Sequence, residues 1–367
     1  MKKELPFLHL KVQESDPFQR GKFIGERVSD KINGNVEIYK KIFKEYANAD
    51  WDTVQTKALR FVEPIQEYAP EMIEELKGMA KGSDLDLADL IALNVRTEIM
   101  FGFSQGVSAE CTACALSKNN TTNQHVIIGQ NWDWKTDVQK NTIITEIEQP
   151  PYPSIMMIAE AGHLGKIGFN SAGIGLCANL LVSSLDKGEV GVPFHAILRK
   201  ILNSRTFNEA VRAVTLANRA SSGNYLIAND KGTILNLETG PGGKENVYYL
   251  GSDEGIFGHA NNFLVETDFE DKTLGILPDS PARAKNIKHE LSKFAEVSVE
   301  HIQDTLRNHD NFPNSICRHS EPINQIQTLA SIIMDLTEKS MTIAPGPPCE
   351  NSFTKVYPDF YKKINAV

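Results

Sequence analysis

Cysteine is scarce in this chain, and the number of cysteines is odd. The five cysteines stand at positions 111, 114, 177, 317 and 349. This sparse set does not suit a disulfide framework and favours a reducing compartment. The chain also lacks any apolar run of about 18 residues, the length that predicts a transmembrane helix. No sustained apolar stretch follows Lys2 and Lys3, so a signal peptide is not expected. These absences predict a cytoplasmic protein.

An excess of basic residues is absent as well. The chain has 38 Lys and Arg against 47 Asp and Glu, and its net charge is −9. A nucleic-acid partner is therefore not expected, because such partners usually leave a basic footprint. The same charge gives no reason to expect a membrane surface. We find no internal repeat and no low-complexity segment. The length of 367 residues is sufficient for a large buried core.

Helical spacing dominates the first hundred residues. Ser15-Asp16-Pro17 combines a capping side chain with a proline in the first turn and predicts a helix start. Gly21 and Gly25 lie on one face of that helix, which predicts tight packing against another element, because glycine inside a helix is otherwise costly. Further helices are expected over residues 53–68, after Pro70, and after a capping box formed by Ser83 and Asp86.

From Cys111 onward, short apolar or alternating runs separated by turn residues predict antiparallel strands. Asp230-Lys231-Gly232, between two such runs, suits a hairpin connection. Helices are expected in pairs, over residues 193–202 and 207–217 and over residues 281–294 and 299–306. Because strands and helices cluster separately, the pattern favours an α+β class with layers over alternating βαβ units.

Cys111 and Cys114 form a C-x-x-C pattern that has three interpretations. A redox pair would stand at the start of a helix, whereas the residues after Cys114 resemble a strand that ends in a turn. A zinc site would need a second ligand pair at suitable spacing, and Cys317-Arg318-His319 and His125 are weak candidates for it. The third interpretation is a small buried cysteine, and we adopt it for Cys114, which alternation places on the face opposite Cys111.

Cys111 has surroundings that suggest a nucleophile. It begins a strand directly after a Gly- and Ser-containing loop, and Gln130-Asn131-Trp132-Asp133 follows at a hairpin-sized distance. Antiparallel pairing of these two strands would bring Asp133 close to Cys111. That arrangement suits a cysteine nucleophile with a carboxylate that organises it.

Several segments, taken in order, resemble the acyl-coenzyme A:6-aminopenicillanic acid acyltransferase family (isopenicillin N acyltransferase-like) of the Ntn hydrolase superfamily. The two segments nearest the candidate nucleophile are Cys111-Thr112 and Gly129-Gln-Asn-Trp-Asp-Trp134. The other similar segments are Asp16 to Gly25, Gly168 to Asn179, Gly258-His-Ala-Asn261, Asp279-Ser280-x-x-Arg283, Thr328 to Asp335 and Thr342 to Pro348. Two positions depart from the family pattern. Glu110 stands where the family often has glycine, and Asn262 where it often has histidine.

The resemblance implies a four-layer αββα sandwich in which two antiparallel sheets lie between helical layers. It also implies a precursor that cleaves itself between Glu110 and Cys111. Residues 1–110 would become a mostly helical chain and residues 111–367 a β-rich catalytic chain, and the two would form one structural domain. The freed α-amine of Cys111 would serve as the base, because an α-amine with a pKa of about 7.7–8 is partly neutral near pH 7.

The resemblance also assigns roles to other residues, each with a plainer alternative. Asp133 would hold the α-amine, or else be a turn residue at a strand end. Asn179 and Asn261 would donate to an oxyanion, or else end their strands in turns. Gln130 would contact the thiol or the substrate, or be an ordinary strand residue. Arg283 would brace the site or bind a substrate carboxylate, or else lie on a surface helix. Asn131, His195 and His259 are expected to be structural, and Trp132 and Trp134 to pack in the core or a pocket wall.

The resulting functional hypothesis is an autoprocessing cysteine enzyme that cleaves or transfers acyl groups on a linear amide through an acyl-thioester on Cys111. A non-catalytic binding protein with the same fold and an unprocessed cysteine peptidase or thioesterase remain as alternatives. No cofactor and no metal are expected. The expected partner is a small-molecule amide, with an acyl-CoA or an amine as a further candidate. The hypothesis also leaves a homo-oligomer open.

Overall fold

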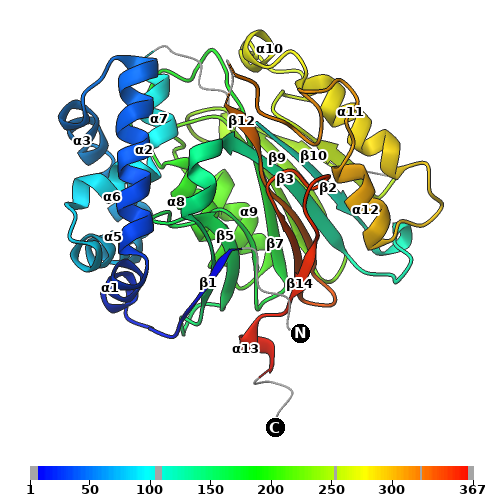
Figure 1. Ribbon diagram of the computed structural model, residues 1–367, viewed down its shortest axis with the longest axis horizontal. Helices are drawn as coiled ribbons and strands as arrows, with labels where there is room; N and C mark the ends of the chain where they lie inside the picture. Colours follow the sequence, from blue (N-terminus) through cyan, green and yellow to red (C-terminus); the bar gives the residue numbers. More distant parts are fainter. Residues whose placement is uncertain (1–6, 104–109, 252–253, 323–324, 363–367) are drawn as a thin grey trace.

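Two β-sheets lie face to face in the protein, and helices cover their outer faces (Figure 1). The computed structural model describes residues 7–103, 110–251, 254–322 and 325–362. The four-layer αββα arrangement, with its helix–sheet–sheet–helix order, is therefore confirmed. Among the described residues, no helix has both the length and the apolar character needed to cross a membrane.

The strands form one sheet of eight and one of six. They are β1 (Leu8–Val12), β2 (Glu110–Leu116), β3 (Ile127–Lys135), β4 (Thr142–Ile147), β5 (Ile155–Glu160), β6 (Ile167–Asn170), β7 (Ile174–Leu180), β8 (Gly223–Asn229), β9 (Ile234–Thr239), β10 (Val247–Leu250), β11 (Ile256–His259), β12 (Ile326–Asp335), β13 (Ser340–Pro345) and β14 (Thr354–Val356). The larger sheet has the order β1-β4-β5-β6-β7-β8-β9-β10, and the smaller sheet has the order β11-β2-β3-β12-β13-β14.

The helices are α1 (Pro17–Arg27), α2 (Ser29–Ala47), α3 (Trp51–Leu59), α4 (Val62–Tyr68), α5 (Pro70–Ser83), α6 (Leu87–Asn94), α7 (Arg96–Phe101), α8 (Phe194–Leu202), α9 (Phe207–Thr215), α10 (Thr273–Ile276), α11 (Ser280–Leu291), α12 (Val299–Leu306) and α13 (Asp359–Lys362). Helices α8 and α9 contact strands β6, β7 and β8 of the larger sheet, and α11 and α12 contact strands β2, β3, β11 and β12 of the smaller sheet. Strand β7 packs against β2 and β3, so the main core lies between the two sheets.

One strand departs from the expected antiparallel sheets. β1 pairs in parallel with β4, with Leu8 opposite Ile143 and Val12 opposite Ile147. The helical spacing of the first hundred residues gave no indication of this strand, because β1 is only five residues long and its partner lies more than 130 residues away in the chain. The amino-terminal segment is thus joined to the β-rich segment through a shared sheet.

Helices α1 and α5 pack through glycines, as Gly21 and Gly25 predicted. A Cβ atom at Gly21 would lie 1.9 Å from the carbonyl oxygen of Glu75, and one at Gly78 would lie 2.0 Å from that of Phe18. Any side chain at these positions would force the two helices apart. The helix start at Asp16 is also confirmed, since its carboxylate accepts the backbone N–H of Gln19.

The predicted helix boundaries near Ser83 are wrong. Ser83 is the last residue of α5, and its hydroxyl donates to the carbonyl of Met79. The capping box belongs instead to Asp86 and Asp89, which open α6. Ser83 and Asp86 have the spacing of a capping box because the end of α5 lies three residues before the N-cap of α6.

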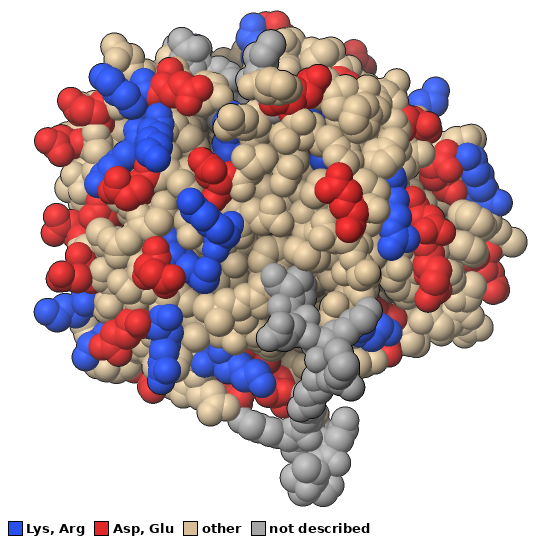
Figure 2. Space-filling view, in the orientation of Figure 1, with Lys and Arg blue, Asp and Glu red and all other residues tan. Residues whose placement is uncertain are grey.

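Charged side chains of both signs are mixed on the face of the molecule shown in Figure 2. They gather over the helices at the two flanks, and mostly uncharged side chains lie between them. This face offers no continuous basic surface, in keeping with the negative net charge.

Candidate active site

The pairing of β2 with β3 brings together the two segments predicted to hold the nucleophile. Cys111 lies opposite Trp132, and Glu110 lies opposite Asp133. The expectation that Asp133 would be adjacent to Cys111 is therefore confirmed. Residues 104–109 and the side chain of Glu110, the predicted cleavage residue, lie outside the described residues.

Side chains alternate between the two faces of β2, and this separates the two cysteines. Cys111 faces the larger sheet and belongs to the main core, with an exposed fraction of 6%. Cys114 faces α11 and α12 and belongs to a second apolar cluster. Cys111 and Cys114 therefore do not form a pair. This agrees with the interpretation of Cys114 as a small buried cysteine.

A small cavity of about 40 Å³ lies beside the Cys111 side chain. Its other lining residues include Gln130, Trp132 and Lys166, with Phe194 and Leu198 from α8. Burial and the charge of Asp133 raise the pKa of the Cys111 thiol to about 11, although the charge of Lys166 and hydrogen bonds from the Asp133 backbone and the Gln130 side chain oppose the shift. The thiol is therefore protonated at neutral pH and needs a proton acceptor to react.

Lys166 is the functional candidate that the sequence analysis missed. Its Nζ lies 4.1 Å from the centre of the Trp132 ring and 3.5 Å from Oε1 of Glu160. Burial lowers the pKa of Lys166 to about 8, against the attraction of Glu160. The only signal in the sequence is a single lysine between Gly165 and the apolar start of β6. A buried lysine with a lowered pKa beside a thiol is suited to accept its proton.

Three side chains hold the backbone of Cys111. Oδ1 of Asn261 accepts its N–H at 2.9 Å. Nδ2 of Asn179 and Nη1 of Arg283 both donate to its carbonyl oxygen, at 3.2 and 2.9 Å. The fold therefore brings Asn179, Asn261 and Arg283 together at one residue, although 68 to 172 positions separate them from it in the chain. The oxyanion role of the two asparagines remains a prediction.

Arg283 lies at the centre of a buried polar network, so its interpretation as a surface residue is wrong. Its exposed fraction is 1%. Nε donates to Asp279, Nη1 also donates to Thr112, and Nη2 donates to Asn261. Because all three nitrogen atoms donate to protein groups, the geometry favours a bracing role over binding of a substrate carboxylate.

Asn262, one of the departures from the family pattern, belongs to the same buried polar network. Its Oδ1 accepts the hydroxyl of Ser280, and that hydroxyl oxygen accepts the backbone N–H of Asn261. The amide of Asn262 thus helps to fix the position of Asn261, a task for which a carboxamide provides the required acceptor.

Asp133 lies on the opposite face of β3 from the side chains that line the cavity. Its Oδ1 accepts the hydroxyl of Thr328 at 2.7 Å, while Oδ2 has no hydrogen-bond partner among the described residues. Burial raises the pKa of this carboxyl to about 7, against the attraction of Arg283. One carboxylate oxygen is therefore available for a further donor at the Glu110–Cys111 end of β2.

The raised pKa of Asp133 predicts a pH-dependent stability difference for Asp133→Asn in a Cys111→Ala background. A carboxyl whose folded-state pKa exceeds the unfolded value stabilises fully below that unfolded value, near 4, and loses this contribution as pH rises to about 7. The carboxamide of the variant cannot ionise, so the variant should match the parent at pH 4 and exceed its free energy of unfolding by about 4 kcal/mol at pH 8. Urea unfolding at the two pH values measures the difference. The exposed Asp137→Asn is the control, and an Asp133→Asn difference independent of pH would contradict the prediction.

Gln130 connects the two sheets. Its Nε2 donates to the carbonyl of Ala178 at 2.7 Å, and its Oε1 accepts the N–H of the same residue at 2.9 Å. Its carboxamide also lies at the cavity and donates to the Cys111 thiol, one of the two predicted contacts, and its contact with a substrate remains a prediction. Asn131, expected to be structural, donates to the carbonyls of Leu306 and Ile316 on the other face.

His195 and His259 are buried and have protein partners, in keeping with the expected structural roles. Nε2 of His259 contacts Glu238 at 2.6 Å. Nε2 of His195 contacts Arg96 at 2.6 Å, and its Nδ1 contacts the carbonyl of Gly165. Trp132 and Trp134 line the cavity beside Cys111, as a pocket-wall role predicted.

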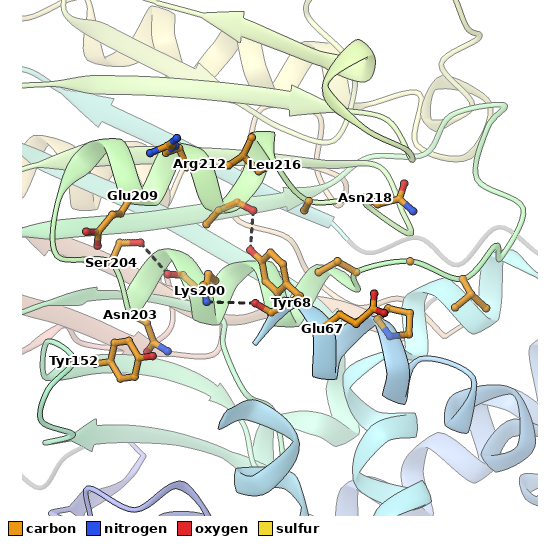
Figure 3. Close-up of a pocket in the computed structure, with 16 residues that line it drawn as sticks. Glu67, Tyr68, Tyr152, Lys200, Asn203, Ser204, Glu209, Arg212, Leu216 and Asn218 are labelled. Atoms are coloured by element: carbon orange, nitrogen blue, oxygen red, sulfur yellow. Dashed lines mark hydrogen bonds between the residues drawn. The ribbon is translucent and has the colours of Figure 1, made fainter. Parts of the chain in front are cut away.

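A larger cavity, of about 700 Å³, lies between α4 and the α8–α9 pair (Figure 3). Tyr68 donates to the carbonyl of Ala213 across it, and Lys200 donates to the carbonyl of Tyr68. The described residues that line it include neither a cysteine nor a histidine. This cavity is therefore not part of the candidate active site.

Comparison with known proteins identifies the family of the chain. Residues 119–349 match the family described as acyl-coenzyme A:6-aminopenicillanic acid acyl-transferase. The 40 kDa form of acyl-coenzyme A:6-aminopenicillanic-acid-acyltransferase from Emericella nidulans is 31% identical over 281 residues, which cover 76% of each chain. The chain belongs to this acyltransferase family. Membership supports acyl transfer on amides as its general activity, and the match to the family begins eight residues after Cys111.

Among solved structures, conjugated bile acid hydrolase from Clostridium perfringens is 12% identical, with a TM-score of 0.47 over 68% of this chain and 93% of the other. Penicillin V acylase from Agrobacterium tumefaciens is 14% identical, with a TM-score of 0.39 over 64% of this chain and 83% of the other.

Proposed function

We propose that this acyltransferase-family member is an autoprocessing enzyme that uses Cys111 as an amino-terminal nucleophile. The observation that carries the proposal is the set of contacts that surrounds Cys111. Its thiol faces a cavity beside Lys166, while its N–H and carbonyl are held by Asn261, Asn179 and Arg283. A buried backbone needs hydrogen-bond partners in any fold, but a purely structural cysteine would need no lysine beside its thiol.

The first step is cleavage of the chain itself. The thiol proton passes to neutral Lys166, and Sγ bonds to the carbonyl carbon of Glu110. The bond from that carbon to the nitrogen of Cys111 breaks, and the nitrogen takes up a proton. Water then hydrolyses the resulting thioester, which releases the Glu110 carboxylate and restores the thiol. Asn261 contacts the leaving nitrogen in the uncleaved chain.

Cleavage leaves the thiol and an α-amine on one residue. The amine accepts the thiol proton in later turnovers, and Asp133 stabilises its charged form through the free carboxylate oxygen. Sγ then attacks the carbonyl of a linear amide, the amine of the substrate leaves with a proton, and an acyl-thioester remains. Asn179 and Asn261 stabilise the oxyanion of this step, as donors do in other acyl-transfer enzymes.

Water or an amine resolves the acyl-thioester, which gives hydrolysis or acyl transfer. The curated relative is named for an acyl-CoA donor and a 6-aminopenicillanic acid acceptor. We propose for this chain the broader class of N-acyl amines, N-acyl amino acids or peptide-like amides, whose acyl group would pack against Trp132 and Phe194. A cavity of about 40 Å³ holds little more than one water, so cleavage must enlarge it.

Lys166→Met should slow self-cleavage about 100-fold, the lower end of the usual contribution of an acid–base group. The wild-type rate should rise as pH increases through about 8, because the neutral fraction of Lys166 increases, and the variant should lose this rise. The rate is measured from the intact mass of freshly made protein over time.

Lys135→Met is the matched control, because Nζ of Lys135 also lies over an aromatic ring, that of Tyr46, at 4.4 Å from its centre. It should cleave at the wild-type rate. If Lys166→Met keeps both the rate and its pH dependence, Lys166 is not the proton acceptor.

Mass spectrometry of the purified wild-type protein tests the proposed function. Two chains, residues 1–110 and 111–367, are expected, and the second should react with iodoacetamide at Cys111. An intact chain that labels at Cys111 would favour an unprocessed cysteine peptidase or thioesterase. An intact chain without labelling would favour a non-catalytic protein. A panel of N-acyl amines and N-acyl amino acids then identifies the substrate class.

A further inference from the structure

Two loops outside the active site bring two cysteines and two histidines together. His309, Cys317 and His319 lie in the segment between α12 and β12, and Cys349 lies in the turn after β13. One ligand atom of each residue lies within 4.8 Å of those of the other three. Nothing in the proposed reaction uses this cluster.

Four of the six distances between the ligand atoms are close to those of a tetrahedral zinc site. Zn–S bonds of about 2.3 Å and Zn–N bonds of about 2.0–2.1 Å place tetrahedral ligand atoms about 3.8 Å apart for S and S, about 3.6 Å for S and N, and about 3.3 Å for N and N. The corresponding distances are 3.5 Å between the two Sγ atoms, 3.7 and 3.3 Å from these atoms to Nε2 of His319, and 3.1 Å between the two Nε2 atoms.

We propose that His309, Cys317, His319 and Cys349 bind one Zn²⁺ ion. Two thiolates and two imidazoles form a common structural ligand set and fill all four positions, so the ion would stabilise the fold without taking part in catalysis. The sequence alone predicted no metal, because Cys317 and His319 lacked a second pair at suitable spacing. The fold supplies that pair from ten residues before His319 and thirty residues after it.

A carboxylate supports the same assignment. Oε1 of Glu350 lies 3.4 Å from Nδ1 of His319, the ring nitrogen that faces away from the other ligands. Metal-bound histidines commonly donate this second N–H to a carboxylate, which fixes the ring and the tautomer that can bind the metal. The two loops are also tied by a hydrogen bond from Nε of Arg307 to the carbonyl of Pro348.

A disulfide between Cys317 and Cys349 is the competing explanation for their proximity. Both cysteines are free thiols in the structure, with sulfurs 3.5 Å apart, well beyond the 2.03–2.05 Å of an S–S bond. A disulfide also leaves the positions of His309 and His319 unexplained. The zinc site accounts for all four residues.

Hydrogen bonds connect the proposed zinc site to the active site through the residue that lies between two of the zinc ligands. Arg318 stands between Cys317 and His319, and its Nη2 donates to Asp279, the partner of Arg283. Its backbone N–H donates to the hydroxyl of Thr328, which in turn donates to Asp133. Zinc would thus hold the loop that hydrogen-bonds to Asp279 and Thr328, the partners of Arg283 and Asp133.

The test is the zinc content of the full-length protein, reduced, supplied with Zn²⁺ and freed of unbound metal by gel filtration. We expect about one zinc per wild-type chain by elemental mass spectrometry. Cys349→Ser and His319→Ala should each retain less than a tenth of that amount. Glu350→Gln should keep the ion but bind it about 10-fold more weakly in competition with a chelator.

His289→Ala, which removes an exposed histidine of α11, is the matched control and should retain the wild-type zinc content. Circular dichroism confirms that each variant is folded, and Cys349 is exposed, so its replacement leaves the core intact. A reduced wild-type chain without zinc would overturn the proposal, as would folded Cys349→Ser and His319→Ala variants that bind as much zinc as the wild type.

Discussion

Cys111→Ala is expected to remain a single chain of 367 residues that folds, does not cleave itself and has no acyl-transfer activity. Without the thiol, neither the thioester to Glu110 nor the later acyl-thioester can form. Loss of the nucleophile in other acyl-transfer enzymes lowers turnover about a million-fold, which is below detection in a cleavage assay. Intact mass and amino-terminal sequencing of the protein measure the result.

Cys114→Ala is the matched control, because it changes the same strand three residues later on the opposite face. It should cleave after Glu110 at a rate close to that of the wild type. If Cys111→Ala still separates into two chains at this bond, Cys111 is not the nucleophile. If neither variant nor the wild type is ever cleaved, the proposal of self-processing is wrong, whatever the activity of the intact chain.

Arg283→Met is expected to reduce both stability and self-cleavage. Removing one member of a buried ion pair commonly costs about 3–5 kcal/mol, and we expect about 3 kcal/mol, because Arg318 would still pair with Asp279. The carbonyl of Cys111 would lose one of its two side-chain donors, and Asp133 would lose the cation that lowers its pKa. We therefore expect self-cleavage to slow about 100-fold, the loss that a misplaced reacting group can cause.

The stability loss is measured by urea unfolding in the Cys111→Ala background. The cleavage rate is measured by intact mass in a chain that retains Cys111. Arg199→Met is a close control. Arg199 is equally buried, and its partner Glu75 would still pair with Arg20. Both variants should lose similar stability, but only Arg283→Met should slow cleavage. Equal slowing in both would show that the effect arises from general destabilisation.

The sequence predicted the strands and the β2–β3 pairing well, because both depend on local signals, whereas the four-layer arrangement came from the family resemblance. Alternating runs separated by turn residues indicated strands such as β8 and β9, and Asp230 to Gly232 does connect them. The short distance from Cys111 to Asp133 made a β2–β3 pairing a natural expectation, and the register confirms it. The resemblance supplied Asn179, Asn261 and Arg283, which the fold brings to Cys111.

Residues that act through distant contacts could not be predicted in the same way. Lys166 looks like an ordinary lysine until the fold places it over Trp132. His309 and Cys349 lie 40 positions apart, and only the meeting of two loops makes them neighbours. Arg283 was ambiguous for the same reason, since helical spacing alone does not show that Thr112 and Asn261 lie against it.

Because side chains alternate along β2, the groups of the candidate site lie on two sides of this strand. The thiol of Cys111 and the walls that would meet a substrate lie toward the larger sheet, whereas Arg283 and its partners gather toward α11. Under the proposed function, substrate preference could therefore be redesigned through Phe194 and Leu198 without altering Arg283 and its partners, although Lys166 lines the same cavity as these two residues. If Cys111 is the nucleophile, changes on the cavity side of β2 would alter which acyl groups bind, while the polar contacts on the α11 side would stay the same.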